Sequence, residues 1–385
     1  MSRRALAIGS AAIGAIGAIG VAVGFVVEPT QAAFSYLTAW GFALSIALGA
    51  LIFLMMGHAT NGRWFVVFRR FAESIVASLP GLAVLFVPIA LSLDRLYPWV
   101  HPAPALGREA LEKLAHKAPY LNVTFFLVRA AVFLVVWIAI GELLTRWSAR
   151  LGRDESRYAP RLRALSAGAL PLVALTLTFA AFDWLMSLTP LWYSTIYGLL
   201  YFSGGFVAAL SLVAVIACGA RRGPTVSSSI HASHTGALGR LMFAFLVFWA
   251  YMEFSQGIII WIANKPDEVP WYVARGAGVW GGVFALLIVG HFALPFFALL
   301  SRPLKRSPLL LAIAGAWIVV MHYVDVYWLV MPVLHGTPEV HWLDLAAPCA
   351  VLGSATAFAI ARTRRRAILA DDDPRFASAV AYEGS

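Results

Sequence analysis

Residues 120–146 read YLNVTFFLVRAAVFLVVWIAIGELLTR, an almost unbroken run of apolar side chains. A bilayer core of roughly 30 Å is crossed by about 20 helical residues at about 1.5 Å per residue, so this run is long enough to span a membrane. Comparable runs recur along the chain, at 5–27, 33–57, 75–97, 120–146, 164–188, 192–218, 240–263, 271–300, 308–331 and 343–361. The pattern predicts an all-α integral membrane protein with ten transmembrane helices in a single domain, 1–361. A polar tail, 362–385, follows.

Composition agrees with this class of protein. The chain is 61% hydrophobic and 12% charged, which lies outside the range of soluble globular domains. Its net charge of +10 is spread over loops, for example at Arg150, Arg153 and Arg157. Basic residues in such loops fix the orientation of the spans in the membrane and contact anionic lipid headgroups. We therefore expect membrane lipid, and no nucleic acid, among the partners.

The basic residues fall mainly on one side of the predicted spans. Of the 29 Lys and Arg residues, 22 lie on the side that holds both termini, 4 on the other side and 3 within or at the ends of spans. The positive-inside rule then places both termini in the cytoplasm. Tryptophans add an independent indication, because most of those near span ends lie on the predicted outer side: Trp99, Trp184, Trp192, Trp261, Trp271, Trp328 and Trp342.

Three further features lead to structural expectations. The first span resembles a signal peptide but is longer, and we expect a retained helix whose glycines at 9, 14, 17, 20 and 24 form a packing face. Loop 98–119 holds Glu109 and Lys113 at i,i+4 spacing, which predicts a short amphipathic helix lying on the outer surface. Loop 219–239 is expected to be flexible, and the tail after Ala361 to be disordered or docked on a partner.

Ionisable residues inside the bilayer are costly, at about 2.5 to 3.5 kcal/mol each, and therefore need an explanation. One set is predicted to share an outer depth band, where charge pairing would relieve burial: Arg129, Asp183, Glu253, Gln256, Arg275, His322 and Asp325. A sparser inner set comprises His58, Glu73, Glu142 and His291. Either the two sets are interhelical bonds that hold the bundle together, or they form a proton route or a pocket for the polar head group of a lipophilic substrate. Clustering favours the second reading, since His322 and Asp325 share a helix face at i,i+3, as do Glu253 and Gln256.

The sequence predicts that this chain holds no metal or redox cofactor itself. Cys218 and Cys349 are too few for an iron–sulfur cluster, which needs four ligands. Counted along their spans, His291 and His322 differ in depth by roughly 16 Å at about 1.5 Å per residue, which would prevent them from sharing a haem iron. His231 and His234 lack acidic or cysteine companions for a metal, and no phosphate-binding loop is present.

Two segments carry a family resemblance. One is FDWLMSLTPLWYSTIYG at 182–198. The other is HTGALGRLMFAFLVFWAYMEFSQ at 234–256, which continues through WIAN at 261–264, PDE at 266–268 and Arg275. Together they resemble the NrfD-like membrane subunits of bacterial alternative complex III, a quinol:cytochrome c oxidoreductase, and the smaller of its two ten-helix subunits most closely. The likeness covers the ten-span plan, while its specific motifs occupy residues 182–275.

The resemblance implies two four-helix bundles flanked by two further helices, in the bacterial cytoplasmic membrane. It implies a second NrfD-like subunit beside this one, and iron–sulfur and multihaem cytochrome c subunits on the outer face that hold the clusters and haems. Asp183, Glu253, Gln256 and Arg275 fall inside the matching motifs, whereas His322 and Asp325 lie outside them. The expected role is a structural subunit with a proton route. Two alternatives stay open, namely the membrane anchor of a polysulfide- or nitrite-reductase-type complex, and a secondary transporter with an inverted five-plus-five repeat.

Overall fold

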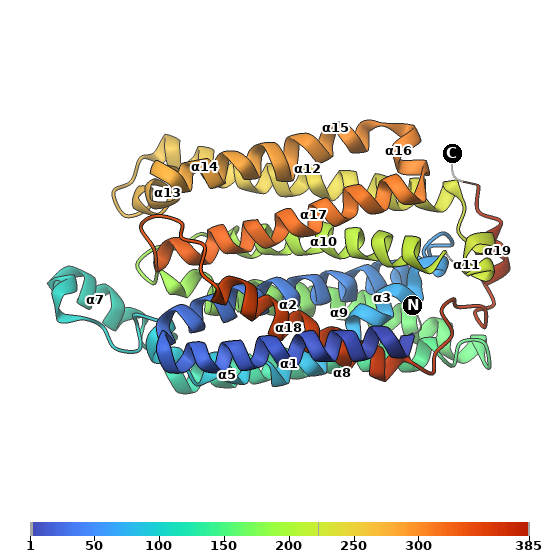
Figure 1. The fold of residues 1–385 in the computed structure, drawn as a ribbon, viewed down its shortest axis with the longest axis horizontal. Helices are drawn as coiled ribbons and strands as arrows, with labels where there is room; N and C mark the ends of the chain where they lie inside the picture. The colour runs from blue at the N-terminus through green and yellow to red at the C-terminus, as the bar shows by residue number, and fades with distance from the viewer. Residues whose placement is uncertain (1–2, 222, 384–385) are drawn as a thin grey trace.

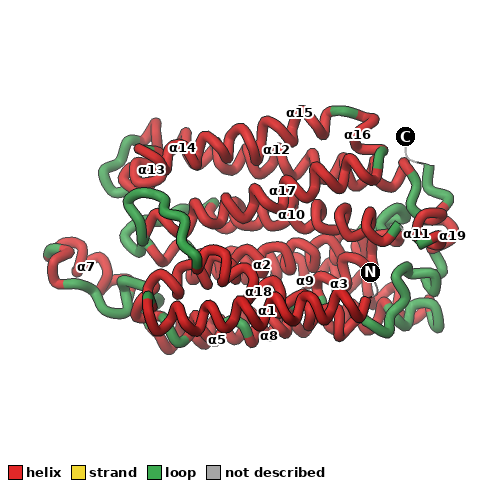
Figure 2. Tube along the Cα trace, viewed as in Figure 1, coloured by secondary structure: helices red, strands yellow, loops and turns green. Residues whose placement is uncertain are grey.

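The computed structural model describes residues 3–221 and 223–383, and over these residues the chain is helical, with no strand (Figures 1 and 2). Ten helical segments are long and apolar enough to cross a membrane, which confirms the expected number. They are Arg3–Val27 (α1), Pro29–Ala59 (α2), Val66–Ala90 (α3 to α5), Val123–Ser148 (α8), Glu155–Leu188 (mostly α9), Tyr197–Ala220 (α10), Ala232–Ala263 (α12), Gly278–Leu300 (α14 to α15), Pro308–Val333 (mostly α17) and Leu343–Thr363 (α18).

Short helices lie between and beyond the spans. They are α6 (Leu93–Leu96), α7 (Arg108–Lys117), α11 (Pro224–Ser229), α13 (Val269–Gly276), α16 (Arg302–Arg306) and α19 (Phe376–Val380). Both ends of the described chain, together with α11, α16 and α19, lie at one end of the bundle, which we call the basic end (Figure 1). The opposite end carries α7 and α13, and we call it the α7 end. The bundle therefore has the two-ended arrangement that an even number of spans requires.

Helix α2 is the central element of the bundle. It packs against α10, α18, α9, α3, α1 and α17, and almost all of its residues are buried. Its small residues, among them Gly41, Ser45 and Gly49, let neighbouring backbones approach closely. A helix that is apolar on every side is either buried in protein or surrounded by lipid, and α2 is buried by its neighbours.

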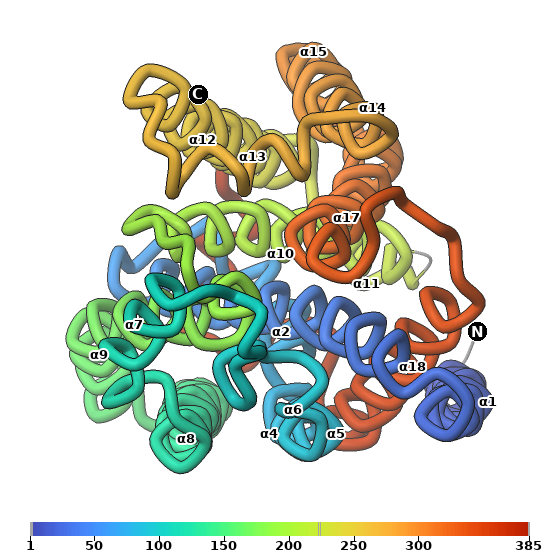
Figure 3. Tube along the Cα trace, turned by 90° about the vertical axis from the view of Figure 1, so that its left-hand side faces the viewer, coloured from blue at the N-terminus to red at the C-terminus, as the bar shows by residue number. Residues whose placement is uncertain are grey.

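The glycines of α1 form the packing face predicted for them. A Cβ on Gly14 would lie 2.7 Å from the backbone nitrogen of Ser354 in α18, and Gly17, Gly20 and Gly24 face the same helix. Gly353 of α18 meets Gly14 reciprocally. Gly9 is the exception, since nothing lies within 4 Å of its added Cβ. The small residues thus hold α1 against α18 at the edge of the bundle (Figure 3).

The third and eighth spans are irregular. The third begins at Val66, nine residues before the predicted start, and turns break it into α3, α4 (Leu79–Val84) and α5 (Val87–Ala90), with prolines near the start of the last two. In the eighth, α13 ends before a break at Gly278, whose φ is 56°, and a π-helix at Leu287–Ala293 separates α14 from α15 (Leu294–Leu300). The predicted span 271–300 therefore joined two elements, and Arg275 belongs to α13.

The loops fit the sequence expectations in part. The amphipathic helix is present as α7, although it projects from the end of the bundle instead of lying flat against it (Figure 1). The expectation of a flexible loop at 219–239 was wrong, because α11 and the first two turns of α12 occupy most of it. His231 and His234 close the start of α12 through a hydrogen bond from the His231 backbone to the His234 ring, 3.0 Å long.

The tail beyond α18 is folded back onto the basic end, which corrects the expectation that it is disordered or waits for a partner. Asp373 is paired with the buried Arg69, and Asp372 accepts from Arg70 at 3.0 Å. The ring nitrogen Nε2 of His234 lies 2.7 Å from the carbonyl oxygen of Ala379 in α19. These contacts explain why Arg69 and Arg70 lie inside the bundle, where no acidic neighbour was expected for them apart from Glu73.

Candidate functional site

The predicted outer set of polar residues divides into two separate groups. Arg129 of α8 and Asp183 of α9 form a two-pronged ion pair, with Nε to Oδ2 at 2.7 Å and Nη2 to Oδ1 at 3.0 Å. Arg129 also donates to the carbonyl of Tyr120 at 2.9 Å, and its guanidinium lies over the Tyr120 ring. Charge and donor capacity are satisfied within the pair, so it acts as a link between α8 and α9.

No hydrogen bond or ion pair between described residues joins this link to the other group, and α2 and α10 lie between them (Figure 3). Arg129 and Asp183 therefore pair with each other, as charge pairing within the band predicted, but they lie apart from the other residues of the band. Equal depth placed these residues in one band, but depth carries no information about which side of the bundle a helix occupies.

The second group, which we call the polar cluster, comprises Glu253 of α12, Arg275 of α13, His322 and Asp325 of α17, and His291 of the π-helix. Both carboxylate oxygens of Glu253 are shielded and accept no hydrogen bond from any described group, and the charged groups that act on this carboxylate are Asp325 and Arg275. The buried phenol of Tyr197 in α10 is close enough to feel the charges of all three. Three transmembrane elements and one short helix thus bring titratable groups to one place.

His322 and Asp325 face each other inside the bundle. Nδ1 of His322 lies 3.4 Å from Oδ2 of Asp325, and its Nε2 lies 2.8 Å from the hydroxyl oxygen of Ser45 in α2. Ser45 donates its one hydroxyl proton to the carbonyl of Phe42 at 2.8 Å, so Nε2 must be the donor to Ser45. Nδ1 has no hydrogen-bond partner among the described groups, and both side chains of the pair are buried within the helices.

His291 belongs to this cluster and not to the inner set in which sequence depth had placed it. Its ring centroid lies 6.3 Å from that of His322, and 4.1 Å from the ring of Trp249 in α12. The predicted 16 Å offset was wrong because the eighth span starts at Gly278 and its π-helix has a shorter rise. Neither ring nitrogen of His291 has a hydrogen-bond partner among the described groups.

The proximity of the two histidines removes the depth argument against a shared haem iron. In His322, Nε2 lies 2.8 Å from Ser45, while Nδ1 faces Asp325 at 3.4 Å and has no hydrogen-bond partner among the described groups. Within residues 3–221 and 223–383, no three His, Cys, Asp or Glu side chains are grouped as metal ligands.

Arg275 and Gln256 surround Glu253 on the side of the α7 end. Arg275 stacks on the ring of Trp271, 3.8 Å from its centroid, and donates to the carbonyl of Leu329 at 2.9 Å. Gln256 accepts from Ser194 at 2.8 Å and donates to the hydroxyl of Tyr272 at 3.1 Å. Gln256 thereby connects the loop before α10 with α13, and both polar side chains hold the rim of the cluster.

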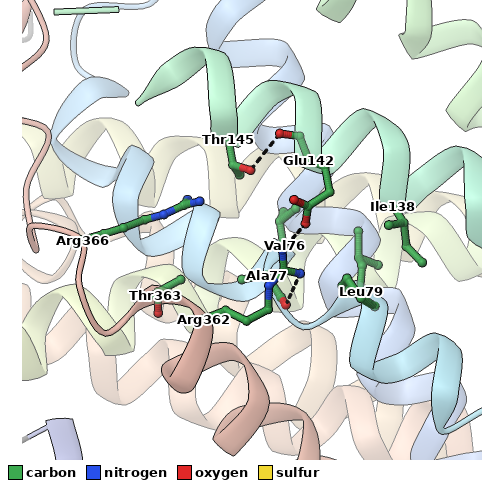
Figure 4. A pocket seen from close by; sticks show the side chains of 11 residues that line it. Val76, Ala77, Leu79, Ile138, Glu142, Thr145, Arg362, Thr363 and Arg366 are labelled. Atoms are coloured by element: carbon green, nitrogen blue, oxygen red, sulfur yellow. Dashed lines mark hydrogen bonds and ion pairs between the residues drawn. The ribbon is translucent and has the colours of Figure 1, made fainter. Parts of the chain in front are cut away.

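The inner candidates are dispersed at the basic end. Glu142 of α8 is bonded to Arg362 of α18 and lies 3.4 Å from Arg146, beside a cavity of about 40 Å³ that Arg366 also lines (Figure 4). Glu73 accepts from Arg70 at 2.9 Å and from Ser148 at 2.5 Å. These groups tie α3, α8 and α18 together.

His58 lies apart from Glu142, near the end of α2. It is buried edge-on against Phe65, and the charged groups that act on it are those of the docked tail and of Arg69. No bond in the described part of the chain connects His58 or Glu142 to the polar cluster. A route between the two ends of the bundle therefore has no continuous chain of these side chains.

Sequence reasoning missed three contributors to the cluster: Ser45, Tyr197 and Gly204. Ser45 and Tyr197 are ordinary residues of apolar spans, and no spacing rule connects α2 or α10 with α17. A Cβ on Gly204 of α10 would lie 2.9 Å from Nδ1 of His322 and 3.1 Å from Oδ2 of Asp325. The absence of a side chain at Gly204 therefore leaves room for His322 and Asp325. This contact between α10 and α17 can be seen only in the folded structure.

Comparison with known protein families gives no matching family model, and no characterised protein matches the chain significantly. The site must be interpreted from its own geometry.

Proposed function

We propose that this chain is an integral membrane subunit of a quinol-oxidising respiratory electron-transfer complex, and that the polar cluster passes protons. The observation that carries the proposal is the meeting of Glu253, His322, Asp325 and His291 from three spans in the apolar interior. A structural ion pair satisfies the hydrogen-bonding groups of both residues, as the pair of Arg129 and Asp183 does. In contrast, both carboxylate oxygens of Glu253 and both ring nitrogens of His291 lack a hydrogen-bond partner among the described groups. Groups arranged in this way suit proton exchange better than adhesion.

The π-helix supports the same interpretation. His291 lies within this π-helix, near Trp249 of α12 and His322 of α17, and the carbonyl of Gly290 in the same segment accepts from Trp317 at 2.7 Å. Such bulges are rare and are frequently found at functional sites. Retaining one beside the cluster indicates that the placement of His291 matters for more than packing.

Within the proposed complex, the chain takes the NrfD-like arrangement of two four-helix bundles and two flanking helices in the bacterial cytoplasmic membrane. Its basic end faces the cytoplasm. A second NrfD-like subunit lies beside it, and iron–sulfur and multihaem cytochrome c subunits cover the α7 end, where Trp261, Val340 and Trp342 expose apolar surface. Quinol is oxidised next to this chain, and its protons enter the cluster through Glu253.

The role is tested by replacing Glu253 with Gln in the assembled complex. The amide keeps the size of the side chain but cannot carry a proton, so assembly should survive while proton release coupled to quinol oxidation falls. Proton release per quinol is measured with a pH-sensitive dye in proteoliposomes. Glu109→Gln, the same change on the exposed helix α7, is the control and should have no effect.

If Glu253 only helps to hold helices together, its replacement should change thermal stability by about 1 kcal/mol, the scale of a hydrogen bond inside a membrane, and leave turnover alone. An assembled Glu253→Gln complex with wild-type turnover and wild-type proton release would remove Glu253 from the route.

The transporter alternative gains one observation, because the third and eighth spans, which an inverted repeat would pair, are both irregular. The irregularities differ in kind, however. Turns interrupt the third span, whereas the π-helix continues through the middle of the eighth. Transport predicts that proteoliposomes with this chain alone take up a solute, while the respiratory role predicts that they do not.

A further inference from the structure

A cavity at the basic end is surrounded by four cations. It has a volume of about 230 Å³, and its charged lining consists of Arg240 of α12 with Arg302, Lys305 and Arg306 of α16. Ala232, Ser233 and Gly236, from the first turns of α12, complete its wall. We call this cavity the basic groove. It lies where α16 links the eighth and ninth spans, and none of its lining residues belongs to the polar cluster.

Three of the four groove cations, all on α16, lack a carboxylate partner among the described residues. No carboxylate of the described residues forms an ion pair with Arg302, Lys305 or Arg306. Partial burial and the neighbouring charge of Arg240 both lower the pKa of Lys305, which means that protein groups around it disfavour its charged form. Placing such cations together costs free energy that an anion in the groove would recover.

The packing of Lys305 fixes its head group at the groove. Its side-chain stem lies against α12, with Cγ 2.8 Å from the position that a Cβ on Gly239 would occupy. Its ammonium lies 5.5 Å from the centroid of the Phe243 ring. The glycine permits the close approach, so the cation is held by the fold and does not swing freely in solvent.

Apolar surface adjoins the groove on its membrane side. Phe243 packs on Phe296 of α15, which in turn contacts Phe297. Phe297 and Leu300, the outward residues of α15 at this level, are 70% and 51% exposed. A bound molecule would therefore meet cations at the mouth of the groove and apolar side chains directly beneath them.

We infer that the basic groove binds the headgroup of an anionic phospholipid of the adjoining leaflet, whose acyl chains lie along α15. Charge complementarity selects the anionic headgroup, and the exposed Phe297 and Leu300 distinguish a lipid from a soluble phosphate. Basic pockets between membrane helices on the cytoplasmic side have this combination of features. The inference is independent of the proposed respiratory role.

The test uses the full chain purified in neutral detergent. Native mass spectrometry with phosphatidylglycerol should show one lipid retained more tightly than the others, and phosphatidylcholine should give no such binding. The triple change Arg240→Gln, Lys305→Gln and Arg306→Gln should weaken retention of phosphatidylglycerol by at least about tenfold, since each basic residue near a lipid surface contributes about 1 kcal/mol.

Two controls keep the result specific. Arg157→Gln, Arg161→Gln and Arg163→Gln remove three exposed charges from the same end of the bundle and should leave retention unchanged. Lys305→Arg keeps the charge and should bind as the wild type does, which separates a lost site from a misfolded chain. Equal loss in the α9 triple variant, or undiminished binding in the groove variant, would overturn the proposal. So would displacement of the lipid by an equal concentration of inorganic phosphate, because that result indicates a site for a soluble anion.

Discussion

At the scale of single residues, Gly204 determines how closely α10 can approach the His322–Asp325 pair. An alanine there would place its Cβ 2.9 Å from the ring of His322, well inside normal contact distance. Because the ring is held by Ser45 on one side and by Asp325 on the other, it cannot move away freely. Gly204→Ala should therefore destabilise the protein by about 1 to 3 kcal/mol, as overpacking of a core does.

The same helix provides a matched control. Gly219 lies in the last turn of α10, and nothing is within 4 Å of its added Cβ. Gly219→Ala should be neutral or slightly stabilising, since alanine favours a helix by about 1 kcal/mol over glycine. Thermal unfolding in detergent measures both variants. Similar melting temperatures for the two would show that the cluster has more room than its distances indicate.

Residue patterns predicted a local contact of the site better than they predicted which residues belong to it. The i,i+3 spacing correctly placed His322 beside Asp325, because helical geometry alone fixes that contact. Counting along spans misplaced His291, since the count depended on where a helix begins and on a π-helix that no pattern signals. It also grouped Arg129 with Glu253, although the two lie on opposite sides of α2 and α10. Local geometry can be read from sequence, while lateral position cannot.

At the scale of elements, α1 depends on a seam of small residues. Gly14→Val would bring a branched side chain against the backbone of Ser354, where an added Cβ already lies at 2.7 Å. Apolar burial gives little driving force between helices in lipid, so close packing must hold α1 in place. We expect the valine to release α1 from α18 while the other nine spans stay assembled.

Disulfide trapping tests this packing. A cysteine pair placed at Ala346 of α18 and Gly20 of α1, which meet across the seam, should cross-link in the parent chain and fail to do so after Gly14→Val. Gly9→Val, at a position where nothing lies within 4 Å, is the control and should leave cross-linking intact. Unchanged cross-linking in the Gly14→Val variant would show that close packing at Gly14 is not needed to hold α1 against α18.

The docked tail is the second element whose stability can be tested. Burial disfavours the charged form of Asp373, but hydrogen bonds from Arg375 and the charges of Arg375 and Arg69 outweigh it, so the pKa of Asp373 falls below its usual 3.8. A carboxylate with a lowered native pKa stabilises the folded state fully above its unfolded pKa, and loses that contribution as the pH falls through the native value. The tail should therefore stay docked at neutral and mildly acidic pH and detach only below about pH 4.

Removing the carboxylate should have the same effect at neutral pH. Asp373→Asn leaves the buried Arg69 with Glu73 at 3.5 Å and the partly exposed Asp372 at 4.0 Å, and should cost about 3 kcal/mol, the lower end of the loss when one partner of a buried pair is removed. Limited proteolysis of the tail measures docking. Asp371→Asn, whose exposed carboxylate forms no ion pair in the described structure, is the control. A tail equally resistant in both variants would show that Asp373 does not hold it.

At the scale of the whole molecule, the ten spans follow from hydropathy and length alone, and the structure confirms their number. Their boundaries are less exact where polar residues are buried. The third span was placed too late because Arg69, Arg70 and Glu73 read as loop residues, whereas the tail and Ser148 satisfy them inside the bundle. A contact between residues 300 positions apart lies beyond any local pattern.

The orientation of the molecule is a prediction that the structure leaves for experiment. The described ends of the chain share one end of the bundle with most of the basic residues, and the rule that cytoplasmic loops are rich in Lys and Arg assigns this end to the cytoplasm. The test begins with a chain in which Cys218 and Cys349 are replaced by Ala. One new cysteine then goes to Ala105, exposed beside α7, or to Ser156, exposed at the start of α9.

In intact cells, an impermeant thiol reagent should label the cysteine at 105 and leave that at 156 unlabelled until the membrane is opened. Ala105 is preferable to its neighbour Gly107, whose φ of 81° makes any side chain strained there. The opposite labelling pattern would show that the protein has the reverse orientation in the membrane. The polar cluster would then stay where it is in the fold, but protons from Glu253 would leave toward the cytoplasm, and the proposed quinol oxidation at the α7 end would no longer release protons outside.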